Sequence, residues 1–197
     1  ALEFDPDLAE AHAARGFCLS LSRQLEAAEQ AFETAIKLNP GLWEAYYFFA
    51  RMCYASGQFD KAARMFDKAC QANPEGYQAS SLLGMTYRTL GLNDKAREVY
   101  ARTVENIERH VGLNPDDSRA IYLGAQALVE LGRRDDGLRW ARRALEIDPD
   151  DPSILYGMAC VCCRVDQLDE ALDHLEKAVQ LGFRHQKDPA QNQSAND

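Results

Sequence analysis

Cysteine is the reactive residue type that gathers most densely in this sequence, in the run Cys160-Val161-Cys162-Cys163. Thiolates bind zinc, and a structural zinc site needs four ligands that converge tetrahedrally. On a helix, Cys162 points toward a different face from Cys160 and Cys163, and no histidine stands near them to complete a ligand set. We therefore interpret the cluster as small, mostly buried apolar residues, and we predict no metal site and no cofactor.

Acid–base or nucleophilic catalysis would need a histidine beside a serine, a cysteine or a carboxylate. The histidines instead stand far apart, at His12, His110, His174 and His185. The acidic pairs Asp135-Asp136 and Asp150-Asp151 fall at expected helix starts, where carboxylates interact favourably with the helix dipole. The sequence offers no triad and no acid–base pair, and we predict that the protein is not an enzyme.

Net charge and composition exclude further classes of function. Lys and Arg number 22 against 31 Asp and Glu, a formal net charge of -9, whereas nucleic-acid binding relies on cations that neutralise phosphates. Phosphate-binding loops are absent, and no run of about 18 apolar residues is present to span a bilayer. We therefore expect neither nucleic acid nor a membrane as a partner. The six cysteines fall within expected helices, which indicates a reducing compartment, so we expect a cytoplasmic protein.

The organisation of the chain is revealed by its prolines. Pro6, Pro40 and Pro74 stand 34 residues apart, and after a gap of 41 residues to Pro115 the interval of 34 returns at Pro149. Such regular spacing is typical of a stack of helical hairpins, each of which contacts only its neighbours. We therefore expect the function of this chain to lie in a surface.

Small residues recur in phase with the prolines where two helices must approach closely. With each proline set at position 32 of a repeat, positions 8, 20 and 27 are Gly or Ala in every repeat except for Thr103. Larger apolar residues follow at helical spacing, as Phe32, Phe66, Tyr100 and Leu175 do on the second helix of their repeats. Each repeat is thus predicted to be an amphipathic helical hairpin.

Glycines and Asn-Pro or Asp-Pro pairs predict where the helices end. Gly57, Gly91 and Gly132 fall at hairpin turns, where Arg23 and Asp166 replace glycine in the outer repeats. The expected first helices are 9–22, 43–56, 77–90, 118–131 and 152–165, and the expected second helices are 25–38, 59–72, 93–111, 134–147 and 168–181. Seven extra residues lengthen the helix at 93–111, and we favour packing of this insertion on the next repeat over a lip for a partner.

These residues resemble the tetratricopeptide repeat family, whose repeats carry Gly or Ala at position 8, Ala at 20, an aromatic residue at 24, Ala at 27 and Pro at 32. The resemblance implies an all-α fold, a right-handed α-solenoid of five hairpins over residues 9–181. Local departures are Arg15, Thr103 and Ala141. The expected repeats are 9–42, 43–76, 77–117 with the seven-residue insertion, 118–151 and 152–181.

The two ends of the chain carry further expectations. Residues 1–8 read as the end of a preceding repeat, because Ala1 and Pro6 fall at positions 27 and 32. Residues 182–197 form a polar tail that we expect to be disordered. The run 175–184 is similar to the closing segment of repeat blocks in bacterial signalling proteins. We therefore interpret the chain as a segment of a larger bacterial tetratricopeptide repeat protein.

The resemblance also implies a ligand site, because in this family the first helices line a concave groove. The groove residues that it implies here are Phe17, Tyr47, Arg51, Tyr54, Met85, Arg88, Arg119, Tyr122, Gln126, Tyr156 and Arg164. Tyrosine and arginine are enriched in binding hot spots, so we expect a peptide with apolar anchors and at least one carboxylate. In the alternative, the tyrosines pack between neighbouring helices and the arginines pair with Glu44 or Glu130.

Three functions remain open at this point. The first is a non-catalytic scaffold that binds a peptide segment of a partner protein in the groove. The second is a regulatory or sensor module of a larger signalling enzyme or transcription regulator, in which ligand binding changes the pitch of the solenoid. The third is self-association as a homodimer through the terminal repeats.

Overall fold

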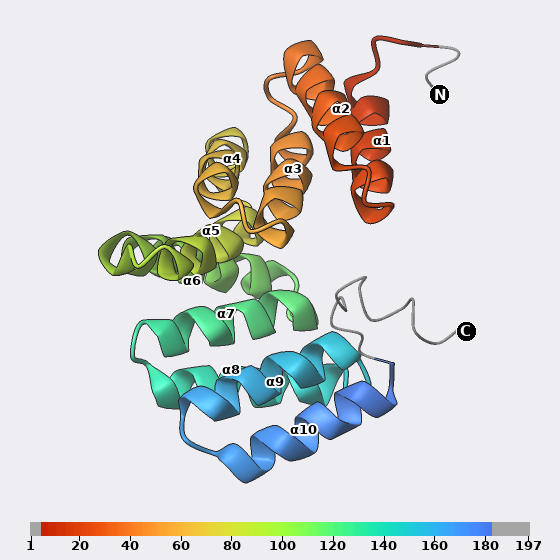
Figure 1. Cartoon of the computed structure of the whole chain (residues 1–197). Coiled ribbons are helices and arrows are strands. Elements are labelled where there is room, and N and C mark those ends of the chain that lie inside the picture. Colours follow the sequence, from red (N-terminus) through yellow and green to blue (C-terminus); the bar gives the residue numbers. More distant parts are fainter. Residues whose placement is uncertain (1–4, 183–197) are drawn as a thin grey trace, which may run out of the picture. The chain divides into compact units, whose positions relative to one another are not determined.

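Apolar residues that recur every three to four positions give ten α-helices in residues 5–182, the part of the chain that this computed structural model describes (Figure 1). The helices are α1 (Ala9–Leu21), α2 (Leu25–Leu38), α3 (Trp43–Ala55), α4 (Phe59–Ala72), α5 (Tyr77–Thr89), α6 (Asn93–Leu113), α7 (Ser118–Glu130), α8 (Arg134–Ile147), α9 (Pro152–Arg164) and α10 (Leu168–Gln180). The predicted fold class, an all-α chain of five helical hairpins, is confirmed. The five first helices begin at the residues expected to open the repeats, and the division of the chain into those repeats stays a prediction.

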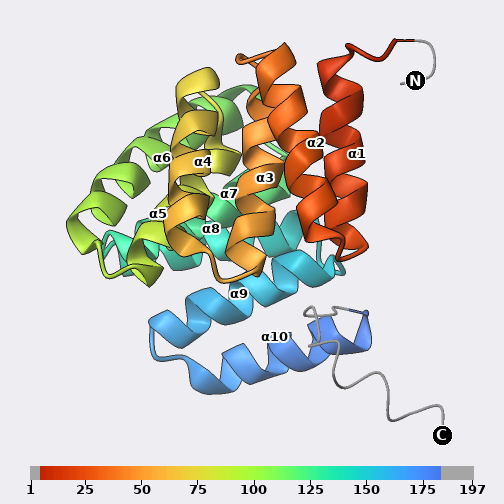
Figure 2. The same ribbon diagram turned by 45° about the horizontal axis from the view of Figure 1, so that its top comes forward.

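The chain divides into two compact units, each described here by itself. Unit 1 comprises Ala1–Asn106 and unit 2 comprises Ile107–Asp197, so that the boundary falls within α6. In unit 1, α1 contacts α2, α3 contacts α4, and α4 contacts α5. In unit 2, α7 contacts α8 and α9 contacts α10, and Figure 2 shows α9 and α10 running side by side.

The hairpin turns share one backbone conformation. At Gly57 the backbone has φ 74°, in the left-handed region that glycine adopts at little cost, and the amide of Gln58 donates to the carbonyl of Cys53 at 2.9 Å. Arg23 and Asp166 take the same conformation, with φ 61° and 65°, although they carry side chains. The sequence prediction that these two residues replace the turn glycine is therefore matched by their backbone.

Each unit buries its own apolar core, to which the second helices contribute large side chains. In unit 1, Phe32 of α2 stacks on Phe49 of α3 with ring centroids 5.5 Å apart, and Phe66 of α4 lies edge-on to Tyr47 at 6.2 Å. In unit 2, Met158 and Val161 of α9 pack with Ala125 and Ala141. The small residues of the repeat allow this packing: a β-carbon on Gly84 of α5 would lie 2.6 Å from the ring of Tyr100 on α6.

The insertion lengthens α6, which ends two residues beyond its predicted end, at Leu113. Val104, Ile107 and Val111 are buried, as expected for packing of the inserted turns. Pro115 disfavours helical backbone at Asn114, and the helix ends immediately before that residue.

The predictions for the chain ends fall largely outside the described residues. Residues 1–4 of the expected end of a preceding repeat, 1–8, lie outside the described residues. The expected polar tail, 182–197, also lies outside them, except for Gly182. Within residues 5–182, no helix has both the length and the apolar character needed to cross a membrane.

Candidate functional site

Six of the predicted groove residues lie on the first helices of unit 1, and Arg51 of α3 is the most exposed of those on that helix. Its guanidinium carbon lies 5.6 Å from the centre of the Tyr47 ring, a cation–π contact. Tyr47 itself is buried, with 6% of its surface exposed. The tyrosine therefore packs in the core, as the alternative interpretation expected, and serves as a platform beneath the arginine.

Apolar side chains lie on the same helices as Arg51. Phe17 of α1 is half-buried and its ring lies 4.6 Å from that of Phe48 on α3. Tyr54 is also half-buried; its ring lies edge-on to Phe59 at 5.1 Å, and its hydroxyl is 3.4 Å from that of Thr89 on α5. We call the set formed by Phe17, Arg51, Tyr54, Met85 and Arg88 the unit 1 surface; Met85 is half-buried and Arg88 is exposed.

Charge is unevenly distributed along α3. Glu44 stands in its first turn and Arg51 seven residues later, which at a rise of 1.5 Å per residue separates them by about 10 Å. No carboxylate among the described residues forms an ion pair with Arg51. The C-terminal half of α3 therefore presents a cation that the described part of the chain does not neutralise.

The other five predicted residues lie in unit 2, on α7 and α9, which contact each other. Arg164 of α9 pairs with Glu130 of α7, as the alternative interpretation expected. Tyr122 is half-buried, and a β-carbon built on Gly157 of α9 would lie 2.7 Å from its ring. Tyr156 and Gln126 are half-buried and Arg119 is exposed, and together with Tyr122 and Arg164 they form what we call the unit 2 surface.

Comparison with known proteins bears on this arrangement of helices. Sequence patterns described as tetratricopeptide repeat match residues 19–68 and 54–110. The chain is a tetratricopeptide repeat protein. The pattern described as anaphase-promoting complex, cyclosome, subunit 3 matches residues 100–178. No curated protein matches the sequence.

Solved tetratricopeptide repeat structures are similar to this one. TTC0263, a thermophilic tetratricopeptide repeat protein of Thermus thermophilus, has a TM-score of 0.66 at 22% identity, over 88% of this chain and 91% of its own. PilF of Pseudomonas aeruginosa has 0.64 at 14%, over 91% and 79%. YrrB, described as having an unusual peptide-binding site, has 0.56 at 24%, over 94% and 92%. At these identities the likenesses show the fold alone.

Membership of the family answers part of the functional question. Tetratricopeptide repeat proteins mediate protein–protein interactions and are generally not catalysts. Several side chains of this member that could do chemistry are engaged in structural contacts. Asp151 caps α9 by accepting hydrogen bonds from the amides of Ser153 and Ile154 at 2.7 and 3.0 Å. His110 pairs with Asp117 at 2.7 Å, and Asp117 in turn caps α7 by accepting from the amide of Ala120.

The cysteines of this tetratricopeptide repeat protein are poor nucleophiles where they are buried. Burial raises the pKa of Cys53 to about 11, that of Cys70 to about 12 and that of Cys162 to about 11. Burial also raises the pKa of Cys160, against a hydrogen bond with Tyr156 that lowers it. Cys18 and Cys163 are exposed. In residues 5–182, no group of three or more His, Cys, Asp or Glu side chains is placed to hold a metal ion.

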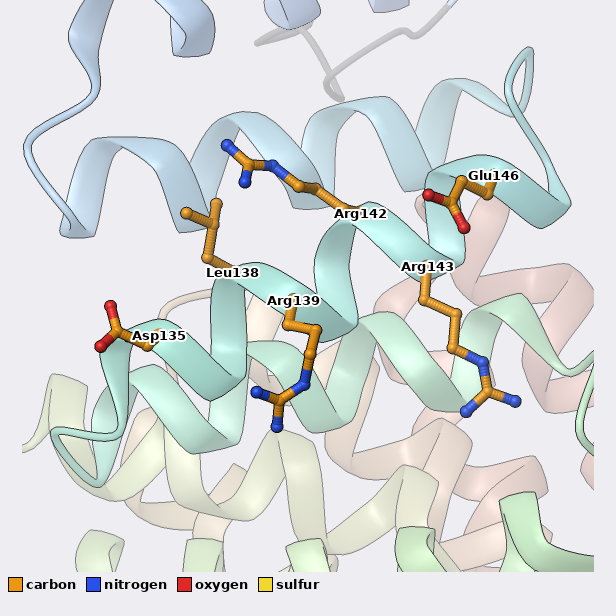
Figure 3. Close-up of a pocket in the computed structure, with 6 residues that line it drawn as sticks. All are labelled: Asp135, Leu138, Arg139, Arg142, Arg143 and Glu146. Carbon is orange, nitrogen blue, oxygen red and sulfur yellow. The ribbon is translucent and has the colours of Figure 1, made fainter.

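A hollow on α8, which no motif of the sequence singled out, is lined by Asp135, Leu138, Arg139, Arg142, Arg143 and Glu146 (Figure 3). Its arginines contact other groups of unit 2. Arg139 pairs with Asp136 at 2.6 Å, Arg142 lies 3.6 Å from Glu170, and Arg143 donates to the carbonyl of Pro115 at 2.6 Å. The hollow is therefore a weaker candidate for an anionic ligand than the unit 1 surface.

Proposed function

We propose that this tetratricopeptide repeat protein is a non-catalytic scaffold that binds a peptide segment of a partner protein on the unit 1 surface. The peptide carries apolar anchors and at least one carboxylate. The observation that carries this proposal is the position of Arg51, an exposed cation held over the ring of Tyr47 without a carboxylate partner among the described residues.

A cation–π contact with a tyrosine prepares an arginine to bind a carboxylate. Arg51 remains exposed in this contact, so its guanidinium can donate two hydrogen bonds to one carboxylate. The contact also restricts the long side chain before binding, so less conformational entropy is lost when the ligand arrives. Arg51 is thus suited to fix the position of an acidic residue in a peptide.

The apolar anchors of the peptide would contact Phe17, Tyr54 and Met85, each of which is half-buried and keeps part of its surface available. Leu21 of α1 is 60% exposed and extends this apolar area. Because Glu44 stands about 10 Å from Arg51 along α3, the carboxylate of the ligand should lie toward the C-terminal half of that helix. We assign Arg88 of α5 a supporting electrostatic role.

The unit 2 surface is a second candidate for peptide contact. Its Tyr156, Gln126 and Arg119 keep some exposure, but the charge of Arg164 is balanced by Glu130. We therefore place the carboxylate contact in unit 1. The regulatory and self-association functions stay hypotheses.

Selection of displayed random peptides on the wild-type protein tests the proposal. We expect the selected peptides to combine apolar residues with Asp or Glu, and to lose affinity about tenfold or more for Arg51→Glu, since hydrogen bonds to charged groups contribute about 1.5–3 kcal/mol. Arg64→Glu, a change of an exposed arginine on α4, is the matched control and should retain affinity. Equal losses of affinity in both variants, or selected peptides without acidic residues, would contradict binding of the peptide at the unit 1 surface.

A further inference from the structure

Cys160 and Cys163 of α9 share one side of the helix, because a step of three residues ends about 60° short of a full turn. Cys160 is half-buried and Cys163 is exposed. Cys162 points to another side, where it is buried with Met158 and Val161. The thiols on the first side lie close enough that a charge on Cys163 raises the pKa of Cys160. We call Cys160 and Cys163 the α9 thiol pair.

The surroundings of the α9 thiol pair favour a thiolate that binds a cation. The hydroxyl of Tyr156, one turn before Cys160, donates a hydrogen bond to the sulfur and thereby lowers the pKa of that thiol against the effect of burial. The carboxylate of Glu130, on the contacting helix α7, is paired with Arg164. Because Cys163 is exposed, a cation can reach the pair from solvent.

The spacing of the α9 thiol pair disfavours a disulfide and suits a cation between the two sulfurs. Side chains three residues apart on a helix have β-carbons about 5–6 Å apart, whereas a disulfide requires about 3.5–4.5 Å. A cation bound between two sulfurs separates them by up to about 4.6 Å, twice the zinc–thiolate bond length of about 2.3 Å. A bridging cation therefore fits a regular helix at these two positions better than a disulfide does.

The number of ligands distinguishes between the cations that thiolates bind. Structural zinc takes four ligands, and within residues 5–182 no third His, Cys, Asp or Glu side chain is placed to join the pair. Monovalent copper is a soft cation that binds thiolates in preference to oxygen ligands, and two thiolates are enough to satisfy it. The argument that excluded a four-ligand zinc site from the sequence therefore does not extend to this cation.

We infer that the α9 thiol pair is a binding site for monovalent copper, which lies between the sulfurs of Cys160 and Cys163. On binding, each thiol releases its proton to solvent and each sulfur forms one bond to the cation, so the site carries one net negative charge. Copper stays monovalent, and no electron is transferred. The site lies in unit 2 and does not depend on Arg51 or on the peptide site proposed above.

Anaerobic titration of the reduced whole chain with monovalent copper, held by a chromogenic chelator, tests this inference. We expect the protein to take one copper ion from the chelator. Alkylation of the loaded protein with iodoacetamide, mapped by mass spectrometry, should then show Cys163 protected, whereas Cys18, the other exposed cysteine, should still react. Zinc offered at the same concentration should protect neither residue, because two thiolates do not complete its ligand set.

Matched variants separate the α9 thiol pair from the other cysteines. Cys163→Ser, at an exposed position, and Cys160→Ser should each weaken copper binding at least about a hundredfold, since even changes beyond the ligands cost about 10–100-fold. Cys18→Ser and Cys162→Ala should retain the affinity of the wild type. Arg51→Glu should also retain it, which distinguishes failure of this inference from failure of the peptide site.

Three results would overturn the inference. Copper affinity that is unchanged in Cys163→Ser would show that this thiol is not a ligand. Protection of Cys18 equal to that of Cys163 at one equivalent of copper would show that single exposed thiols bind the cation. A loss of affinity in Cys162→Ala as large as that in Cys160→Ser, with an unchanged circular dichroism spectrum, would show that the buried thiol is a ligand and that the α9 thiol pair is not the site.

Discussion

Gly137 of α8 lies against the backbone of Ala125 on α7, whose carbonyl oxygen would be 2.8 Å from a β-carbon at position 137. The Val129 side chain would be closer still, at 2.4 Å. Helix propensity alone predicts that Gly137→Ala stabilises the protein by about 1 kcal/mol. Because a backbone atom cannot yield as a side chain can, we expect the opposite, a loss of about 1–3 kcal/mol in urea denaturation.

Gly112 provides the matched control for this prediction. It lies within α6, and no atom stands within 4 Å of a β-carbon built there. Gly112→Ala should therefore follow helix propensity and stabilise by up to about 1 kcal/mol. A stabilising Gly137→Ala would contradict the close approach of α7 and α8.

Arg23 provides a second prediction, because its φ of 61° is one that a residue with a side chain adopts at a cost. Arg23→Gly should raise the free energy of unfolding by about 1 kcal/mol. Its neighbour Ser22, with φ -83°, gains nothing from glycine, and Ser22→Gly should be neutral or destabilising. Gly57→Ala, at φ 74°, should destabilise although no atom stands within 4 Å of the new methyl group. Equal effects of Arg23→Gly and Ser22→Gly on urea denaturation would refute the assignment of strain to the turn.

The six cysteines should divide by burial in a thiol-reactivity experiment. With a disulfide reagent near pH 8 and mass-spectrometric mapping, we expect Cys18 and Cys163 to react within the native protein. Cys53 and Cys162 should react only as the protein unfolds, because both are fully buried. Native-state labelling of Cys53 at the rate of Cys18 would contradict the packing of α3.

Stability should also fall at alkaline pH through these thiols. The folded-state pKa of Cys70 is raised to about 12 from an ordinary value of 9.0, so the unfolded chain loses its proton first. The contribution is complete below about pH 9 and is lost as the pH rises toward the folded value. Urea unfolding at pH 8 and pH 10 should therefore show a steeper decline in the wild type than in Cys70→Ala, and parallel declines would exclude the effect.

The sequence was sufficient to predict the helical hairpins because their determinants are local and repeated. The proline interval and the small residues in phase with it placed the starts of the first helices correctly. Where the insertion interrupts the repeat, the predicted end of α6 at residue 111 falls two residues short, and the helix continues to Leu113. The family resemblance is confirmed by the matched sequence patterns.

The sequence could not decide which groove residues remain available. Tyr47 and Tyr54 are both predicted groove residues on α3, yet Tyr47 is buried against Phe66 and Tyr54 is half-buried. The exposure of each tyrosine depends on aromatic neighbours from other helices. The pairing of Arg164 with Glu130 was one of two interpretations until the two helices were placed. The exposure of Leu175 was equally hidden, because its position in the repeat is a core position in the other hairpins.

A double-mutant cycle between Arg51 and the carboxylate of a selected peptide tests the central claim most directly. The four affinities are those of the wild type and Arg51→Gln, each for the acidic peptide and for its amide analogue. If Arg51 binds that carboxylate, the cycle should give a coupling energy of about 1 kcal/mol or more. If the two single changes in binding free energy add up to that of the double change within about 0.3 kcal/mol, the two groups do not interact, and the proposed peptide site is contradicted.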